Sequence, residues 1–333
     1  MTTDVSIILV NYKTKDLAKQ CIESIYEKTH DVNFDIYVID NGSDDGIEEL
    51  LKQEFPRVKF LQSNENKGFG AGNNIALRVF DSKYAFLLNT DTILINNAVK
   101  ILFDFMEANP KTGACGGNLY DEQGQNIHSY GNIFDLTDLF LKTFNLRYFF
   151  PKRHRKMKDK GLNQNNELKS VDYITGADLM LRKEALDKAG LFDERFFMYS
   201  EEAELQYRIK KSGYDIFINP EAKIIHLHNK SPKKREKMYF EFLKSKYLMF
   251  SLCFGTKKNL GIIKFLFYVS CFAKIFSHRE AICSLFDFIS KDNIEVKYSG
   301  SIFRRRHWCC LQISDYNDIK QIFWYCTLGN FQR

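Results

Sequence analysis

Acidic side chains at the ends of apolar runs are the first residues in this sequence that could do chemistry. Asp40 follows the run Phe34 to Ile39 and opens an acidic segment of turn residues, DNGSDDG. An aspartate in such a place can accept hydrogen bonds from a base or a ribose. Asp91 closes the triplet NTD after the run YAFLL, and its oxygens suit Mg²⁺ or Mn²⁺, which take further oxygens from a bound diphosphate. Taken alone, each segment is also consistent with an ordinary turn.

A second group of carboxylates opens a predicted helix. Glu201, Glu202 and Glu204 follow the aromatic-rich stretch FDERFFMYS. Beside aromatic rings, a carboxylate can act as a general base in a partly dry cleft. The helix dipole also favours acidic residues in a first turn, so a purely structural role is an alternative. His226 and His228 end an apolar run shortly afterwards, where a histidine is either structural or a metal ligand.

The elements that must position these residues alternate in type. Apolar β-branched runs predict strands, and apolar residues at helical spacing predict the helices between them. This alternation predicts parallel pairing in an α/β sheet that is buried on both faces and binds ligands at the carboxyl ends of its strands. The predicted strands are Val5 to Val10, Phe34 to Ile39, Arg57 to Leu61 and Tyr84 to Leu88, and the predicted helices are Lys15 to Lys28, Gly46 to Gln53 and Ala71 to Phe80.

The pattern weakens in the middle of the chain and then resumes. Between Ile127 and Lys169 the periodicity dissolves and the charge rises, which predicts an excursion or a flexible loop. Order resumes at Val171 to Leu181, followed by a predicted helix at Ser200 to Lys211. Two further strands are predicted, Asp215 to Asn219 and Ala222 to His226.

The C-terminal region differs in composition from the rest. A chain of 333 residues suggests one large domain with an appendage, and the stretches after Met238 predict helices rich in Phe and Tyr. The longest uncharged run there, Phe265 to Ala273, is far shorter than the ~20 residues that cross a bilayer. Lysines in this region could flank an apolar face that binds anionic membrane, and packing onto the main domain is the alternative. They are Lys244, Lys246, Lys257, Lys258, Lys264 and Lys274.

Charge, cysteines and the N-terminus set further expectations. The net charge of +6 is concentrated in two basic runs, KRHRKMKDK and KSPKKREK, which either attract anionic groups or are simply solvated. Eight cysteines without C-x-x-C spacing argue against a zinc cage or a disulfide framework. The N-terminus has no basic segment followed by an apolar one, which predicts a cytoplasmic protein.

A glycine-rich segment raises a different class of protein, the nicotinamide dehydrogenases. Gly68, Gly70 and Gly72 are closely spaced, but the dinucleotide fingerprint needs a further glycine three residues beyond its second one. The sequence has Asn73 after Gly70 and Ile75 after Gly72, and the segment follows the third predicted strand rather than the first. We therefore disfavour this alternative.

Six segments in order, from Val5 to His228, resemble family 2 glycosyltransferases, in particular the bacterial rhamnosyltransferase-like branch. They are VSIILVNYKT, IDNGSDDG, NKGFGAGNN, LLNTDT, ITGADLMLR and FDERFFMYSEEAELQYRIKKSGY, followed by PEAKIIHLH. The resemblance implies a GT-A fold, a nucleotide-sugar donor, a divalent metal and inversion at the anomeric carbon. It implies a GT-A domain over residues 1–235, with a nucleotide half of about 1–120 and an acceptor half of about 121–235, and leaves 236–333 as the helical region.

The resemblance also implies roles for particular residues. Glu202 falls at the position of the catalytic base, where the family usually has aspartate, so Glu201 stays an alternative. Asp91 is implied to bind the metal and His226 to complete its site, although Asn89 replaces the first aspartate of the family's metal motif. Residues implied to hold the donor are Asn11, Tyr12, Asp40, Asn64, Lys67, Gly68, Asn73, Asn89 and Asp91, and those implied to line the acceptor pocket are Gly176, Ala177, Asp178 and Glu201.

The predicted function is therefore a metal-dependent hexosyltransferase of surface polysaccharide synthesis. Its donor is expected to be a dTDP- or UDP-sugar and its acceptor a saccharide or lipid-linked saccharide, without a nucleic-acid partner. Contact with the inner face of the cell membrane would place it beside a lipid-linked acceptor. A catalytically silent relative that binds saccharide or scaffolds an assembly is the alternative, and the joint presence of Asp91, Glu202 and His226 argues against it.

Overall fold

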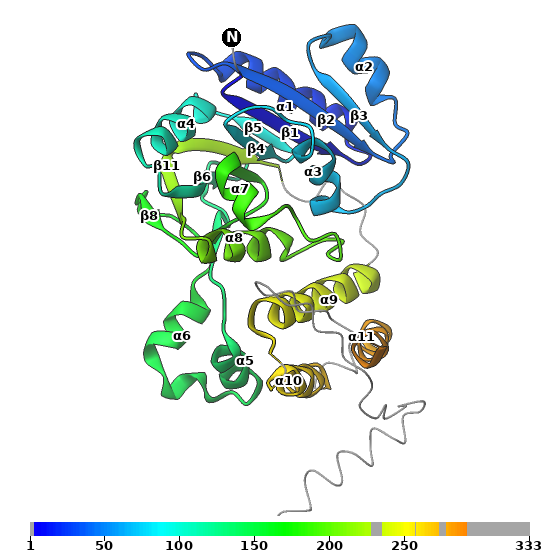
Figure 1. Cartoon of the computed structure of the whole chain (residues 1–333), viewed down its shortest axis with the longest axis vertical. Helices are drawn as coiled ribbons and strands as arrows, with labels where there is room; N and C mark the ends of the chain where they lie inside the picture. Colours follow the sequence, from blue (N-terminus) through cyan, green and yellow to red (C-terminus); the bar gives the residue numbers. More distant parts are fainter. Residues whose placement is uncertain (1–2, 228–234, 257, 273–277, 292–333) are drawn as a thin grey trace, which may run out of the picture.

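The computed structural model describes residues 3–227, 235–256, 258–272 and 278–291. A layered α/β part is built around one sheet, and further helices lie at one end of the molecule (Figure 1). The sheet has nine strands in the order β3-β2-β1-β4-β10-β6-β11-β5, and β8 pairs with β11. This architecture confirms the predicted α/β fold class.

The first half of the sheet consists of four parallel strands with helices between them. Their register aligns Asn11 with Asp40, and Asp40 with Gln62, so the polar strand ends lie side by side. The sequence predicted all seven elements, with ends that differ by at most three residues. They are β1 (Val5–Asn11), α1 (Lys15–Lys28), β2 (Phe34–Asn41), α2 (Ile47–Glu54), β3 (Lys59–Ser63), α3 (Phe69–Leu77) and β4 (Tyr84–Leu88).

The second half of the sheet is mixed. Strand β10 runs antiparallel to β4 and β6, whereas β6 and β11 are parallel. The two strands predicted between Asp215 and His226 are one strand, with a register shift between Ile218 and Lys223 that contains Pro220, which has no N–H for the ladder. The elements are β5 (Thr92–Leu94), α4 (Ala98–Ala108), β6 (Thr112–Tyr120), β8 (Lys169–Ser170), β10 (Asp178–Arg182), α7 (Lys183–Ala189), α8 (Glu201–Lys211) and β11 (Asp215–His226). Strands β7 (Tyr130–Gly131) and β9 (Tyr173–Ile174) form a separate two-stranded antiparallel sheet.

Each face of the sheet carries its own hydrophobic core. Apolar side chains of α1, α2 and α4 pack on one face, and those of α3, α7 and α8 pack on the other. Removing both faces from water is the main stabilising contribution, since burial of apolar area drives folding. The cysteines of the described residues are free thiols, as predicted, and Cys309, Cys310 and Cys326 lie outside the described residues.

The segment between Ile127 and Lys169, predicted as an excursion or flexible loop, contains short helices instead. They are α5 (Leu136–Thr143), the 3₁₀ helix η1 (Leu146–Phe149) and α6 (Pro151–Lys158). A reciprocal capping box between Asp135 and Asp138 starts α5, and Pro151 begins α6 at a position where its missing N–H costs nothing. Arg153 pairs with both aspartates and so ties the two helices together.

Helices α9 (Arg235–Phe254), α10 (Leu260–Phe272) and α11 (Arg279–Lys291) confirm the helical character predicted for the C-terminal region as far as residue 291. Their side chains form a third hydrophobic core, which also includes Leu139 of α5. We call α5, α9, α10 and α11 the helical lobe; it lies at the end of the molecule away from β1 to β3 (Figure 1). Residues 292–333 lie outside the described residues. Within the described part, no helix combines the length and the apolar character needed to cross a membrane.

Candidate active site

The ends of β1 and β2 form a polar cluster around Asp40. Asn11 Nδ2 donates hydrogen bonds to Asp40 Oδ1 at 3.1 Å and to Ser43 Oγ at 2.9 Å, and Gln62 Nε2 donates to Asp40 Oδ2 at 3.0 Å. Burial opposes ionisation of Asp40, but the hydrogen bonds from Ser43, Gln62 and Asn11 outweigh it and hold the pKa of this carboxyl below its usual value. The cluster therefore presents a buried, ionised carboxylate. Tyr12, which follows Asn11 in the chain, is 41% exposed.

The glycine-rich segment packs tightly against two other parts of the site. Gly68 has φ of +86°, and a Cβ there would lie 1.9 Å from the carbonyl oxygen of Phe197, so only glycine fits. The amide of Phe69 donates to that same carbonyl at 3.0 Å. Among the implied donor residues, Asn64 and Lys67 have exposed side chains, whereas Asn73 is buried and donates to the carbonyl of Phe69 at 3.0 Å.

Asp91 and His226 come together although 135 positions separate them in the sequence. Strand β5 pairs with β11 so that Thr92 faces His226, and the amide of Leu227 donates to the carbonyl of Asp91 at 2.8 Å. This pairing places His226 Nε2 at 3.0 Å from Asp91 Oδ1 and at 3.5 Å from Asn89 Nδ2. The two side chains are 23% and 10% exposed, so both are accessible at the sheet edge.

The Asp91–His226 pair fits a divalent ion that also binds substrate. No group of three or more His, Cys, Asp or Glu side chains within the described residues could hold a metal by itself. One carboxylate and one imidazole leave most coordination positions to phosphate oxygens and water, which is the arrangement that Mg²⁺ and Mn²⁺ adopt with nucleotides. These two side chains are therefore suited to hold a metal ion that binds together with a diphosphate.

A short segment before β10 links these clusters to α8. The carbonyl of Ala177 accepts from the amide of Asn89 at 3.0 Å, and Gly176 lies against the ring of Phe69. Ile174 exchanges two hydrogen bonds of 2.8 Å with the side chain of Gln206 in α8. Asn89, Phe69 and α8 therefore all contact the five residues 174–178.

Asp178, implied to line the acceptor pocket, is fully buried in β10. Its Oδ2 accepts from the amide of Gly117 at 2.7 Å, and its Oδ1 has no hydrogen-bond partner among the described residues. Burial raises the pKa of this carboxyl well above its usual value, and the hydrogen bond from Gly117 offsets only part of the effect. Burial thus favours the protonated form of Asp178, and Ala177 beside it is also buried, at 4% exposed.

The start of α8 holds two carboxyl groups of different character. Glu201 is 3% exposed, and burial, together with the charge of Glu202, raises its pKa well above the usual value. Glu202 is half-buried; burial raises its pKa to about 6, against the opposing effect of backbone amides at the helix start. At neutral pH Glu202 is therefore ionised, whereas burial and the neighbouring charge favour the protonated form of Glu201.

The turn before α8 has an unusual backbone. Tyr199 and Ser200 both adopt left-handed conformations, with φ of +72° and +65°, which are uncommon for residues other than glycine. Helix α9 supports this turn from the helical lobe, because Ser245 Oγ donates to the carbonyl of Met198 at 2.7 Å and the ring of Phe242 packs edge-on against Tyr199 at 5.8 Å. Such strain persists only where the surrounding structure holds it.

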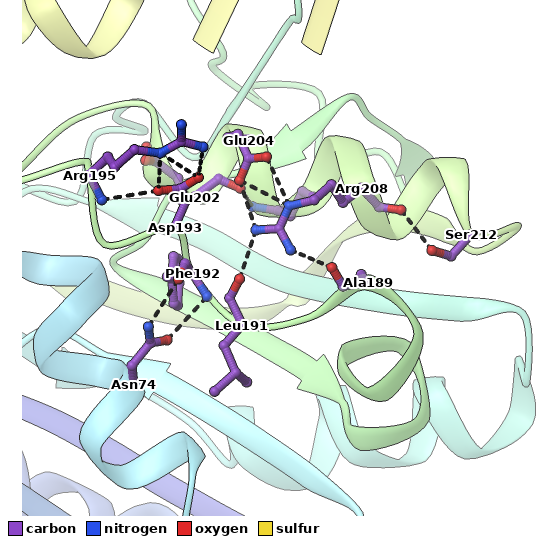
Figure 2. A network of polar contacts seen from close by, with 11 residues as sticks. Asn74, Ala189, Leu191, Phe192, Asp193, Arg195, Glu202, Glu204, Arg208 and Ser212 are labelled. Carbon is purple, nitrogen blue, oxygen red and sulfur yellow. Dashed lines mark hydrogen bonds and ion pairs between the residues drawn. The ribbon is translucent and has the colours of Figure 1, made fainter. Parts of the chain in front are cut away.

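Helix α8 is also anchored on its other side, as Figure 2 shows. Arg208 pairs with Glu204 at 2.7 Å and donates to the carbonyls of Ala189 and Leu191. Asn74 of α3 exchanges hydrogen bonds of 3.0 and 3.1 Å with the backbone of Phe192. Four of these contacting residues were not predicted from the sequence: Arg208, Asn74, Gln206 and Ser245. Only Arg208 had a local signal, the spacing of four residues from Glu204.

The fold and this site define a class of protein. The structure resembles the mannosyltransferase PcManGT from Pyrobaculum calidifontis in complex with GDP-Man and Mn²⁺, with a TM-score of 0.53 and 14% identity over 88% of this chain and 77% of that one. It also resembles GalNAc-T7 with UDP, GalNAc and Mn²⁺, with a TM-score of 0.57 and 14% identity over 87% of this chain and 56% of that one. The fold is thus that of the GT-A glycosyltransferases, as predicted.

A family model and several relatives agree with the fold. The model described as glycosyl transferase family 2 matches residues 6–190. N-acetylglucosaminyl-diphospho-decaprenol L-rhamnosyltransferase of Mycobacterium tuberculosis is 24% identical over 237 residues, which cover 68% of this chain and 76% of the relative. Rhamnosyltransferase WbbL of Escherichia coli K12 is 24% identical over 239 residues, 67% of this chain and 83% of the relative. This chain therefore belongs to glycosyl transferase family 2 and is a glycosyltransferase, which confirms the family predicted from its motifs.

Proposed function

We propose that this glycosyltransferase transfers a sugar from a dTDP- or UDP-sugar to a hydroxyl group of a saccharide or lipid-linked saccharide, with inversion at the anomeric carbon. The observation that carries the proposal is the 3.0 Å approach of Asp91 and His226, two residues 135 positions apart, at the edge where polar strand ends gather. Relatives whose names specify rhamnosyl transfer, one of them to a decaprenol-linked saccharide, support this acceptor class.

The donor would bind along the strand ends of the nucleotide half. The ionised carboxylate of Asp40 is suited to accept a hydrogen bond from the base, with Asn11 and Tyr12 beside it. Asp91 and His226 would hold a divalent ion, which supplies positive charge to the departing diphosphate. The exposed side chains of Asn64 and Lys67 are available to the donor. Mn²⁺ in the two solved structures supports a metal of this kind.

Glu202 is our proposed catalytic base, and Glu201 is not. The acceptor oxygen attacks the anomeric carbon and passes its proton to the Glu202 carboxylate, while the bond from the anomeric carbon to the diphosphate breaks and its electron pair leaves with the nucleoside diphosphate. A base must be ionised to accept this proton, and its pKa of about 6 keeps Glu202 ionised at neutral pH yet basic enough to work. Burial and the charge of Glu202 raise the pKa of Glu201 and favour its protonated form, which makes Glu201 the less suited of the two to accept another proton.

The test is a donor screen with the full chain. We expect calorimetry to find one nucleoside diphosphate that binds with Mn²⁺ and loses most of its affinity in EDTA, and the matching sugar donor to be hydrolysed slowly without acceptor. Failure of every nucleoside diphosphate to bind with Mn²⁺ would contradict the proposed donor class. Binding without turnover of any donor, even with a prenyl-diphosphate saccharide, would indicate the catalytically silent relative instead.

A lipid-linked acceptor makes contact with a membrane part of this proposal. The acceptor's lipid stays in the bilayer, so the enzyme must work at its surface, on the cytoplasmic side if the chain is cytoplasmic as predicted. The sequence places this contact in residues 236–333, through lysines beside aromatic rings. The arrangement of those side chains in the structure favours a different surface.

A further inference from the structure

Exposed aromatic rings are concentrated on the insertion that contains α5, η1 and α6. Five of the twelve large apolar side chains that are exposed in the described residues fall within residues 140–150, and Phe149 is 78% exposed. The basic helix α6 follows them directly. We call these rings and the exposed cations of α6 the aromatic–basic face: Phe140, Phe144, Tyr148, Phe149 and Phe150 with Lys152, Arg155 and Lys158.

The rings of this face are exposed although the opposite side of the same helix is well packed. Leu139 of α5 belongs to the core of the helical lobe, and α5 contacts α10 beside it (Figure 1). Phe140 and Phe144 point away from that core and pack on each other, with ring centroids 4.9 Å apart. The insertion is therefore a fixed platform that holds its aromatic rings in water, where they gain nothing from burial.

The cations of α6 form two sets, one that faces the protein and one that faces solvent. Arg153 and Lys156 are half-buried and pair with Asp135, Asp138 and Asp172 of the protein. Lys152, Arg155 and Lys158 are exposed, and none of the ion pairs in the described part of the chain includes them. Their spacing of three residues keeps them within roughly 120° of the helix circumference. The outward side of α6 therefore lacks anionic partners, whereas its inward side is neutralised.

We propose that the aromatic–basic face docks on an anionic lipid bilayer, with the rings of residues 140–150 inserted among the headgroups and the cations of α6 bound to lipid phosphates. Aromatic rings beside lysine and arginine suit this interface, because rings partition into it and each cation attracts anionic headgroups. The inference rests on the proposed function only for its biological purpose, since a bilayer carries a lipid-linked acceptor.

The C-terminal helices are less suited to this contact. Lys246 lies over the ring of Phe242 at 4.2 Å, Lys244 pairs with Glu241 at 3.3 Å, and Lys264 donates to the carbonyl of Ile289 at 3.0 Å. Lys257 and Lys274, also predicted to contact membrane, lie outside the described residues. Three of the predicted lysines therefore have interactions within the lobe, whereas Lys258 is exposed. On α10, Ile262 and Phe265 are exposed and could extend the docking surface.

The test compares vesicle binding by the full chain and two sets of variants. We expect sedimentation with phosphatidylglycerol vesicles to exceed that with phosphatidylcholine vesicles. Lys152→Gln, Arg155→Gln and Lys158→Gln together should lower the partition coefficient on anionic vesicles about 100-fold, at about fivefold for each cation, and this difference should shrink in 0.5 M salt. Phe144→Ser with Phe149→Ser should weaken binding to both kinds of vesicle, by about tenfold for each ring.

Matched variants on the sheet domain serve as controls. Arg57→Gln, Lys111→Gln and Lys223→Gln remove the same charge from exposed positions, and Val79→Ser with Ile95→Ser removes exposed apolar side chains; both sets should bind vesicles like the wild type. Equal loss in the controls and in the face variants would overturn the docking surface. So would wild-type affinity in the face variants, or self-association of the wild type that they abolish without lipid.

Donor hydrolysis separates this inference from the proposed function. The face variants should hydrolyse a water-soluble donor at the wild-type rate, because none of the changed residues belongs to the proposed active site. A wild type that hydrolyses donor but binds no vesicle would overturn the membrane docking and leave the transferase intact. A wild type that binds vesicles but no nucleoside diphosphate would overturn the proposed transferase function and leave the membrane docking intact.

Discussion

The strand-end edge of the sheet and the helical lobe use different residue types for different purposes. At the edge, Asp40, Asp91 and His226 lie at the ends of buried strands, where the sheet register fixes their positions. In the lobe, rings such as Tyr247 and Phe267 are buried in a core that belongs to three sequential helices and to α5. The edge is thus arranged for chemistry and the lobe for packing. The two regions meet where α9 contacts the turn that precedes Glu202.

The largest expected effect comes from removing the proposed base at the start of α8, a change that leaves the lobe intact. Glu202→Gln should lower turnover by ~10² to 10⁴ with little change in donor affinity, because general-base catalysis typically contributes this much. In the wild type, kcat/KM should fall as the pH drops below about 6, since protonation removes the base. The measurement is turnover against pH with saturating donor.

Glu201→Gln is the matched control, because it changes the neighbouring carboxyl by the same atoms. It should retain most of the activity, since burial and the charge of Glu202 already favour the protonated form of Glu201. An inactive Glu201→Gln beside an active Glu202→Gln would assign the base to Glu201 and refute our choice.

The next effect concerns the metal pair at the same edge. Asp91→Ala should abolish the dependence of nucleoside diphosphate binding on Mn²⁺, because the neighbours Asn89 and Thr90 carry no charge. His226→Ala should weaken the dependence without abolishing it. Calorimetric titration with and without EDTA measures both, and strong Mn²⁺-dependent binding by Asp91→Ala would exclude this pair as the metal site.

A third prediction tests whether the lobe influences the edge. Phe242→Ala removes the ring that packs on Tyr199, and Ser245→Ala removes the hydrogen bond to Met198; together they should lower kcat about tenfold, since small misplacement of a catalytic group is costly. Donor affinity should stay unchanged, because Asp91 and His226 lie at β5 and β11 and not in the turn that α9 contacts. Val79→Ala, far from α9 in the chain, is the control. An unchanged kcat would mean that the turn holds its strained backbone without α9.

The same contrast explains how much the sequence could predict. The first seven elements were predictable because buried strands and helices with one apolar face have clear periods, and strand ends in a parallel sheet must share an edge. The order of the motifs along the chain then indicated the family. The approach of Asp91 and His226 was implied by resemblance, and the β5–β11 pairing gives its physical cause.

The features that were missed depend on contacts between distant segments. Helices α5 and α6 have eight residues each, too few for a period to stand out. Helix α5 is stabilised by the Asp135–Asp138 capping box and by Leu139 in a core supplied by residues beyond 235, and α6 is tied to it by the ion pairs of Arg153. Likewise, Gln206 and Ser245 act on backbone groups 32 and 47 positions away. Contacts between residues so far apart in the sequence cannot be predicted from local patterns.

The smallest effect sharpens the comparison within the sheet itself, at the buried carboxyl of Asp178. Its folded pKa lies well above the unfolded value, so the folded state binds a proton that the unfolded state has already released. The associated stability is complete at acidic pH, below the unfolded pKa, and declines as the pH rises toward the folded pKa. Asp178→Asn cannot titrate and still offers an oxygen to the amide of Gly117, so its melting temperature should fall less than that of the wild type between pH 5 and pH 8. The difference should be a few degrees, given roughly 2 to 4 °C for each kcal/mol in domains of 150 to 250 residues.

Asp187→Asn, at an exposed position, should follow the wild type. A wild-type melting temperature that rises over this range relative to Asp178→Asn would show that Asp178 is ionised in the folded protein and has an anion-stabilising partner, which would make it a candidate for binding substrate rather than a neutral part of the core.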